Sequence, residues 1–365
     1  MDENNLKASN LVAASIDLLY DGMEVQEDIY DAWAERMLIK RGSTLNADRI
    51  KSIKKLNEGS SVIYVSGNTY RTLLKKGPPV EADSRRELEE ATGYAAIKDE
   101  TLELLDEIAH TKAVKQEALQ SVSIELSQRL ESTSPSTILS LINALAPVDE
   151  YLQRHCANVS LLNGLLGRWL GLPKEVVDRL VLIGLLHDCG KALIPPQVMN
   201  APRRLTIAEF EVIKMHTVYS YDLLAEFPES VRRASRSHHE KVNGTGYPDS
   251  LSRDNIPLEA RITAVSDIYD AMVSQRAYKE PQSPFSIMAM LNELSCSELD
   301  GRLVNVFNMN MPKELIDKPV QLNDGRIGII RSFDPDDIEY PMIEVNGRVM
   351  KSSKHFYCTA MYHED

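Results

Sequence analysis

The residues with the clearest chemical potential are His187 and Asp188, which close an apolar segment of the chain. Residues 176–188 have the spacing of an apolar helix, and Gly190 is a typical stop signal just beyond it. An imidazole and a carboxylate at the buried end of such a helix need partners, because unpaired buried polar groups are costly. A metal ion is one such partner, and the rest of the chain offers further ligands for it.

Seven imidazole and carboxylate side chains between residues 150 and 270 form a candidate ligand set. All supply nitrogen or oxygen and none a thiolate, which favours Fe, Mn, Co, Ni or Zn over a soft thiolate site. Seven ligands are too many for one metal with an open position, so the set predicts two ions. Asp188 is the natural bridge because a carboxylate has two oxygens. The predicted ligands are His155, His187, Asp188, His216, His238, His239 and Asp267.

Single members of this set are weak signals. His155 or His216 alone would more often be an ordinary core or surface histidine. Only the combination of all seven side chains makes metal binding by each of them the better interpretation. Cys156 and Cys189 lie beside proposed ligands, and we interpret them as small buried hydrophobic residues. The four cysteines of the chain contain no CxxC pair and are interpreted as reduced thiols.

Bulk properties exclude several classes of protein. The 365 residues suffice for two or three domains, and 43% hydrophobic with 26% charged residues is typical of globular proteins. A net charge of −13 argues against binding to DNA or to an anionic membrane. No apolar run approaches the roughly 18 residues of a membrane span. The polar start MDENNLKASN is not a secretory signal, so we expect a cytoplasmic protein.

The flanking regions predict smaller modules. Residues 1–78 are predicted to form a small α+β regulatory domain, with loosely ordered residues up to about 15 and strands at 37–39 and 61–65. A connector helix is predicted over 79–135, with leucines that offer a face to a partner copy in a homodimer. Residues 311–365 predict a β-hairpin subdomain, whose second hairpin turns at Asn346-Gly347.

The central region, residues 136–310, predicts almost only helices, and it contains all the candidate metal ligands. The fold class is therefore mainly α: an all-helical domain that carries the candidate metal ligands, with an α+β N-terminal domain and a small β C-terminal cap. The expected helices span 136–145, 149–170, 174–188, 206–225, 229–239, 258–276 and 284–299.

Several motifs of this region occur in the order of a known family. His187-Asp188 is followed by Gly190-Lys191, by His238-His239-Glu240 with the loop 243–248, and by the run 267–279. Together they resemble the HD-GYP family, bacterial phosphodiesterases of cyclic dinucleotides, chiefly cyclic di-GMP, within the HD metal-hydrolase superfamily. The resemblance covers about 145–305. The N-terminal domain is similar to a small module often found ahead of this domain.

The resemblance implies the metal ligands named above and further site residues. Lys191 and Asp188 would be the catalytic residues. Lys191 would neutralise the negative charge that builds on the phosphoryl oxygens. Substrate binding would fall to Tyr247, Arg276, Lys279 and Asp270.

Two positions depart from the family pattern. Asn243 stands where the loop usually carries Asp, which is a mild change because both residues suit a turn. Tyr151 stands where some members carry a Glu ligand for a third metal. Two divalent ions are therefore expected and a third is not. Iron is the first expectation, with manganese or another transition metal as alternatives.

The implied reaction is hydrolysis of cyclic di-GMP to linear pGpG, and further to GMP, by a hydroxide held between the metals. One alternative is a catalytically silent receptor for cyclic dinucleotides. Another is a related HD hydrolase that acts on cyclic GMP-AMP or a different nucleotide. The complete ligand set favours an enzyme, and the Tyr247 loop with Arg276 and Lys279 favours a cyclic dinucleotide.

Overall fold

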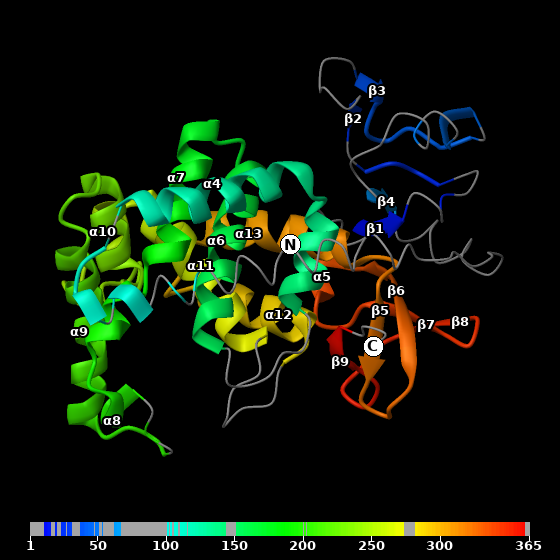
Figure 1. Cartoon of the computed structure of the whole chain (residues 1–365). Helices are drawn as coiled ribbons and strands as arrows, with labels where there is room; N and C mark the ends of the chain where they lie inside the picture. Colours follow the sequence, from blue (N-terminus) through cyan, green and yellow to red (C-terminus); the bar gives the residue numbers. More distant parts are fainter. Residues whose placement is uncertain are drawn as a thin grey trace, which may run out of the picture. The chain divides into compact units, whose positions relative to one another are not determined.

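The chain forms two compact units in a computed structural model (Figure 1). Apart from isolated positions, the structure describes residues 101–143, 151–273 and 282–361, and part of 11–66. One unit contains residues 1–83, 282–289 and 308–365, and the other contains 84–281 and 290–307.

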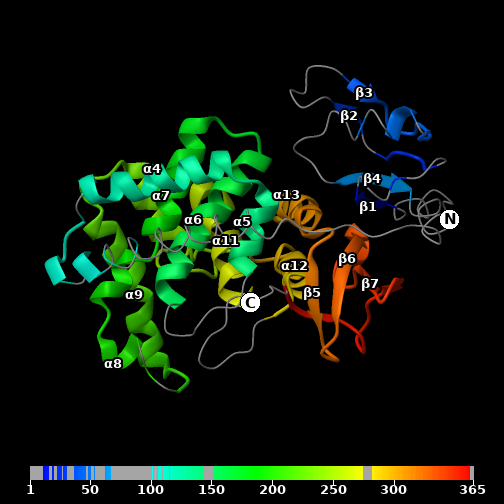
Figure 2. The ribbon, with the colours of Figure 1, turned by 45° about the vertical axis from the view of Figure 1, so that its right-hand side comes forward.

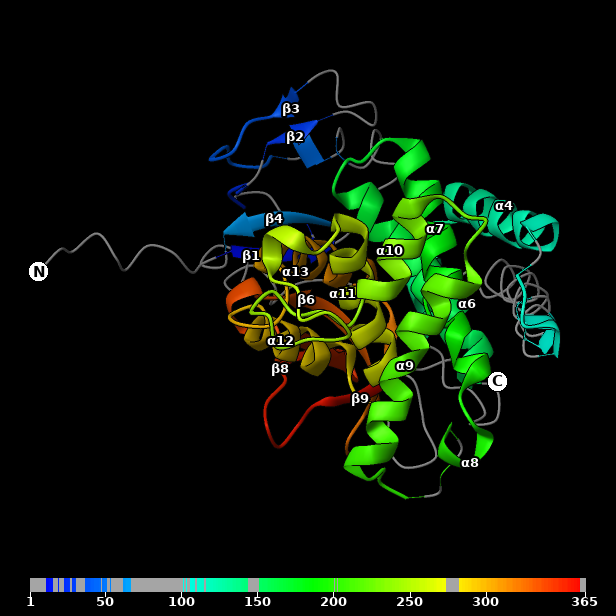
Figure 3. The ribbon, with the colours of Figure 1, turned by 90° about the vertical axis from the view of Figure 1, so that its left-hand side faces the viewer.

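The second unit is built from helices, as predicted for the central region. α6 and α7 pack along each other, α11 lies against both, and α4 covers the pair (Figures 1 and 3). Gly184 permits the close approach of α7 to α6, because a methyl group there would overlap the backbone of Ser160. The described helices are α4 (Gln116–Ser132), α5 (Pro135–Asn143), α6 (Tyr151–Trp169), α7 (Lys174–Leu186), α8 (Pro196–Met199), α9 (Ile207–Leu223), α10 (Glu229–Ser237), α11 (Leu258–Val273), α12 (Pro284–Leu294) and α13 (Gly301–Asn310), with short 3-10 turns η5 (Cys189–Leu193), η6 (Arg253–Asn255) and η7 (Met311–Leu315). The first residues of α12, the last of α13 and the whole of η7 belong to the first unit.

The prediction of one continuous connector helix is wrong. Helical residues end at Thr111, and α4 begins only at Gln116. Lys112 adopts a positive φ of 53°, which no helix continues through. The Thr111 hydroxyl bonds the carbonyl oxygen of Glu107 at 2.8 Å and that of Ala113 at 3.1 Å, which stabilises the break.

The apolar face of α4 is buried inside the chain itself. Leu119, Leu126 and Leu130 are all at most 1% exposed, and α4 packs on α6 and α7. These leucines were expected to face a partner copy. They instead complete the helical core. An amphipathic helix buries its apolar face against neighbouring elements, and here α6 and α7 supply that surface.

The first unit contains the strands. β1 (Leu11–Ser15) and β4 (Val62–Ser66) pair with each other, and β1 also pairs with β6 (Ile327–Phe333) (Figure 2). The order β4-β1-β6-β5-β9 is extended by β7 and β8 beside β6. The remaining strands are β5 (Pro319–Leu322), β7 (Met342–Val345), β8 (Arg348–Lys351) and β9 (Cys358–Met361), with η8 (Pro335–Asp337) between β6 and β7 and a separate pair β2 (Ile29–Tyr30) and β3 (Met37–Ile39).

Two expectations for this unit differ from the structure. Residues 11–15 form β1 where loosely ordered chain was expected. The predicted N-terminal domain and C-terminal cap share one sheet, joined at Ala13–Phe333 and Ala14–Ser332. Pairing satisfies backbone groups that each short sheet would leave open at its edge. Both predicted hairpins are confirmed, and Asn346 and Gly347 have the positive φ values of a tight hairpin turn.

A search of the helices in the described part of the chain finds none that combines the length and the apolar character needed to cross a membrane.

Candidate metal centre

Five helical segments bring the predicted ligands together. His155 lies in the second turn of α6, His187 and Asp188 follow α7, His216 lies in α9, His238 and His239 follow α10, and Asp267 lies in α11. Each segment thus contributes one ligand or one adjacent pair. Sequence spacing alone could not show this convergence, which depends on how the helices pack.

The packing of η5 against α9 fixes two of these segments relative to each other. Gly190 leaves no room for a side chain, because a Cβ there would overlap the carbonyl oxygen of His216. Its N–H donates to the Ser220 hydroxyl at 2.9 Å, and that hydroxyl donates to the carbonyl oxygen of His187 at 3.0 Å. Gly190 is therefore a close-packing residue as well as a helix stop.

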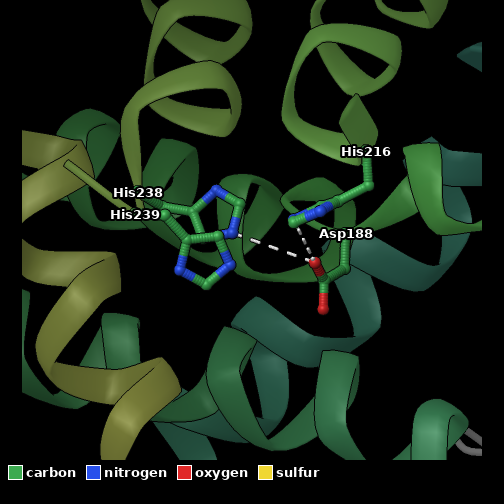
Figure 4. A group of neighbouring side chains, drawn as sticks. All are labelled: Asp188, His216, His238 and His239. Atoms are coloured by element: carbon green, nitrogen blue, oxygen red, sulfur yellow. Dashed lines mark ion pairs between the residues drawn. The ribbon is translucent and has the colours of Figure 1, made fainter. Parts of the chain in front are cut away.

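The ligand atoms form two adjacent groups, and within each group they all lie within 4.8 Å of one another. One group is His155, His187 and Asp267. The other consists of Asp188, His216, His238 and His239, whose side chains turn toward a common centre in Figure 4.

Asp188 faces both groups with different oxygens. Its Oδ1 lies 3.2 Å from Nε2 of His216 and 3.8 Å from Nε2 of His238 (dashed in Figure 4). Its Oδ2 lies 3.3 Å from Nε2 of His187 and 3.4 Å from Nε2 of His155. A carboxylate oriented in this way can bridge two ions.

Asp267 spans the two groups from the other side. Its Oδ1 lies 3.2 Å from Nε2 of His155, and its Oδ2 lies 3.8 Å from Nδ1 of His239. Asp267 and His155 are nearly buried, whereas the His239 side chain keeps 26% of its surface exposed. Among these ligands, His239 therefore marks a side of the cluster that solvent reaches.

Hydrogen bonds at Nδ1 fix the orientation of four imidazoles. His187, His216 and His238 place Nδ1 at 2.8, 2.6 and 2.8 Å from backbone carbonyl oxygens three residues earlier. His155 places Nδ1 2.7 Å from Oδ2 of Asp270. Since these acceptors require a proton on Nδ1, the Nε2 atoms carry the lone pairs and point into the cluster.

The residues present fit bound metal ions. The Nε2 atoms of His187, His216 and His238 and Oδ1 of Asp188 are buried and lack a hydrogen-bond partner within the described chain. Buried polar atoms without partners are rare and costly, so several in one place require an explanation. Divalent cations that accept nitrogen and oxygen ligands supply one.

The protonation states also suit metal binding. Burial alone raises the pKa of Asp188, but the Lys191 ammonium and the His187 imidazole lower it to well below its usual range. Burial, with the neighbouring imidazoles of His239 and His187, lowers the pKa of His238 well below 6.5. Burial lowers the pKa of His239 to about 3. Near neutral pH these groups are a carboxylate and neutral imidazoles, the forms that bind metals.

Lys191 lies beside the proposed bridging carboxylate of Asp188. Its ammonium contacts Oδ2 of Asp188, and its side chain is 17% exposed. A cation at this position offsets the negative charge of the two carboxylates and of an anion bound beside them.

The glycine loop after His239 is held by a residue to which the sequence assigned no role. Glu240 is 4% exposed and accepts hydrogen bonds from the backbone N–H groups of Asp249 at 2.7 Å and Leu251 at 2.9 Å. Gly246 packs on the backbone of Glu240, where a Cβ would overlap it. A carboxylate directly after two adjacent histidines was the available signal, since a buried acid requires donors.

Two other loop residues have local roles. Asn243 accepts bonds from the N–H and hydroxyl of Thr245 at 3.0 and 2.7 Å, so Asn satisfies the turn that an Asp would otherwise form. Tyr247 lies against His239 with ring centres 4.8 Å apart and planes inclined by 32°. The loop tyrosine therefore reaches the edge of the ligand cluster.

Asp270 was expected to bind substrate, and that role stays a prediction; in the structure its carboxylate contacts two other buried side chains. Asp270 is 0% exposed, and its Oδ1 accepts a hydrogen bond from Asn158 at 2.6 Å while Oδ2 meets His155. It positions a ligand from behind. Arg276 and Lys279 lie outside the described residues, and so does the side chain of Tyr151, which bears on a third metal.

Cys156 and Cys189 are buried, as expected for small hydrophobic residues. Burial raises the pKa of each thiol to about 12. Both remain protonated thiols near neutral pH, so neither resembles a thiolate ligand.

Comparisons with known proteins agree with this architecture. Residues 139–303 match the sequence profile of the HD domain. The chain is 32% identical to a cyclic di-GMP phosphodiesterase of Pseudomonas aeruginosa over 58% of this chain and 51% of the relative. It is 36% identical to the cyclic di-GMP phosphodiesterase response regulator RpfG of Xanthomonas campestris over 53% of each protein. The chain thus spans about half the length of these relatives.

A third relative is named for a different substrate, and one solved structure shares the fold. The 3'3'-cGAMP-specific phosphodiesterase 2 of Vibrio cholerae is 29% identical over 50% of this chain and 36% of the relative. An HDG"Y"P protein from Bdellovibrio bacteriovorus superposes with a TM-score of 0.51 at 16% identity, covering 83% of this chain and 100% of that one. At that identity the likeness concerns the fold alone.

Residues 139–303 are thus an HD domain, the helical metal-binding class that the ligand cluster defines. With its His187-Asp188 pair and its Gly246-Tyr247-Pro248 loop, this domain is similar to the phosphodiesterases named above over about half of the chain.

Proposed function

We propose that this protein hydrolyses a phosphodiester bond of cyclic di-GMP and releases linear pGpG, with two divalent metals as cofactors. The observation that carries the proposal is the orientation of Asp188, whose two oxygens face two different sets of imidazoles. A carboxylate shared between two ligand groups suits two neighbouring metal ions, which can stabilise both the attacking and the leaving oxygen of a phosphodiester.

The ligand groups divide naturally between two ions. His155, His187 and Asp267 would hold one, and His216, His238 and His239 the other, with Asp188 shared. When bound, such ions polarise the phosphodiester and lower the pKa of water. Imidazole and carboxylate donors without thiolate suit iron or manganese. We propose iron as the native metal, with manganese as a functional substitute.

The remaining residues act on charge and position. Asp188 stays ionised because Lys191 and the imidazoles offset its burial. Lys191, which contacts Asp188 and keeps part of its side chain exposed, would donate to the phosphoryl oxygens as negative charge builds there. His239 and Tyr247 form the more open edge of the cluster, where substrate would enter.

Substrate identity rests on the relatives and the loop. Two of the relatives described above are named for cyclic di-GMP, and one for 3'3'-cGAMP. Cyclic di-GMP is therefore the proposed substrate and the mixed dinucleotide is its competitor. Arg276 and Lys279 remain predicted phosphate or guanine contacts, and the order of pGpG and GMP as products remains a prediction as well.

The test is hydrolysis of cyclic di-GMP by protein loaded anaerobically with Fe²⁺ or Mn²⁺, followed by chromatography of the products. We expect pGpG from the wild type and none from the His187→Ala/Asp188→Ala variant. Asp254→Asn, which changes an exposed carboxylate, is the matched control and should retain wild-type turnover. Tight nucleotide binding without turnover under both metal conditions would favour the silent receptor instead.

A further inference from the structure

Two side chains on α9 adjoin Tyr247 of the glycine loop that follows His239, and neither is a proposed metal ligand. Phe210 and Lys214 are four residues apart, so they lie one turn apart on the same face of this helix. The Phe210 ring centre is 6.3 Å from that of Tyr247, with planes at 80°. Lys214 Nζ lies 5.1 Å from the Phe210 ring centre and 5.6 Å from that of Tyr247.

Phe210 is one of several exposed apolar residues of α9, and it is the aromatic one among them. It is 45% exposed, although most large apolar side chains of this unit are buried. An aromatic surface left in water beside a catalytic cluster costs free energy that a stacked ligand recovers.

Tyr247 is less available for stacking than Phe210. One side of its ring lies against His239 at 4.8 Å, and the His216 ring centre is 6.5 Å away. Tyr247 therefore connects the metal ligands to Phe210 and leaves the outer ring of Phe210 as the open aromatic surface. A nucleotide whose phosphate lies at the ligand cluster can place its base against Phe210.

The charge beside this ring selects among bases. The Lys214 ammonium carries three donors, and Glu211 accepts one of them at 2.6 Å. Guanine presents two acceptors, O6 and N7, on one edge, whereas adenine presents an amino group in place of O6. An ammonium at the margin of a stacking surface therefore favours guanine over adenine.

We propose that Phe210 and Lys214 form a guanine-binding subsite of this enzyme, with Phe210 stacking on the base and Lys214 donating to its O6/N7 edge. The proposal rests on the proposed cyclic di-GMP hydrolysis and adds the residues that set base preference. The chain has an overall charge of −13, so a local cation next to the aromatic surface also helps to retain an anionic nucleotide.

The test measures Phe210→Ala, Lys214→Met and Lys214→Arg against Val212→Ala. Val212 is 37% exposed on the same helix, but two residues from Phe210 and so on a different face, which makes it the matched control. The probes are cyclic di-GMP, cyclic di-AMP, GMP, and bis(p-nitrophenyl) phosphate as a diester that carries no purine. GMP binding is measured by calorimetry on Mn²⁺-loaded protein.

Phe210→Ala should weaken GMP binding and raise KM for cyclic di-GMP by about tenfold, the size of one lost base–aromatic stack. Its kcat and its rate on bis(p-nitrophenyl) phosphate should stay near wild type. Lys214→Met should reduce the preference for cyclic di-GMP over cyclic di-AMP, and Lys214→Arg should retain it. Val212→Ala should change none of these values.

Unchanged GMP affinity and KM in Phe210→Ala would overturn the subsite while leaving the proposed hydrolysis intact. A wild type that binds GMP through Phe210 and cleaves bis(p-nitrophenyl) phosphate, yet not cyclic di-GMP, would support the subsite and contradict the proposed substrate. An equal loss of rate on both diesters would show that Phe210 supports the metal ligands, and would also overturn the subsite.

Discussion

Oδ2 of Asp270 lies 2.7 Å from Nδ1 of His155, and both side chains are buried. This carboxylate holds the imidazole so that Nε2 faces Asp188 and Asp267. Asp270 is therefore part of the metal centre without being one of its proposed ligands.

Asp270→Asn should weaken metal binding about 10- to 100-fold, the usual effect of removing an acceptor behind a ligating histidine. The variant keeps the side-chain shape, so its circular dichroism should match wild type. Metal affinity is measured by competition with a chelator, and Asp254→Asn serves as the exposed control. Wild-type affinity in Asp270→Asn would show that the hydrogen bond does not orient His155 for binding.

Glu240→Ala should destabilise the glycine loop that follows His239. Two backbone N–H groups, of Asp249 and Leu251, would lose a charged acceptor, which costs about 2 kcal/mol of unfolding free energy. Denaturation in urea measures this loss, with Glu226→Ala as an exposed control. Turnover should fall while metal content stays constant. If stability and turnover both match the control, Glu240 does not hold the loop.

The helices and the ligand types followed from the sequence because apolar periodicity and isolated polar residues are local signals. The role of Asp270 did not, because its contact with His155 spans 115 residues and depends on how α11 packs on α6. The break at Lys112 was missed because one residue with positive φ leaves the surrounding helical pattern unchanged.

The shared sheet was missed for a related reason. β1 and β6 are separated by most of the chain, and strand patterns do not specify their partners. The contacts of Phe210 and Lys214 with Tyr247 could not be predicted either, because the sequence does not show which residues an exposed Phe on a helix contacts.

The metal-free protein should lose stability as the pH falls below about 6.5, the pKa of an unfolded histidine. The folded state keeps His239 neutral down to a pKa of about 3, so in this range the unfolded chain binds the extra proton. The free energy of unfolding then decreases by up to about 1.4 kcal/mol per pH unit for each such imidazole. His238, with a pKa also lowered well below 6.5, acts in the same direction.

His239→Gln removes one of these contributions. Between about pH 6 and pH 4.5, its unfolding free energy should therefore depend less steeply on pH than that of wild type. Urea titrations at several pH values measure both slopes. Equal slopes would show that His239 is protonated alike in the folded and unfolded chain.

One of the four cysteines should react with thiol reagents much faster than the other three. Cys296 is exposed, whereas burial raises the pKa of Cys156, Cys189 and Cys358 to about 12. The native protein should react with one equivalent of a thiol reagent at about pH 8, and the unfolded chain with four. Mass spectrometry identifies the labelled residue. Rapid labelling of Cys189 would contradict the closed packing behind the ligand cluster.

The most direct test of the two-metal account is a titration of metal-free protein with Mn²⁺ in which metal binding and cyclic di-GMP hydrolysis are followed together. Because the two oxygens of Asp188 face two ligand groups, we expect two equivalents to bind and the rate to rise with the second. Asp188→Asn should lose both binding and rate. Full activity after one equivalent, or two bound equivalents without hydrolysis, would contradict the account.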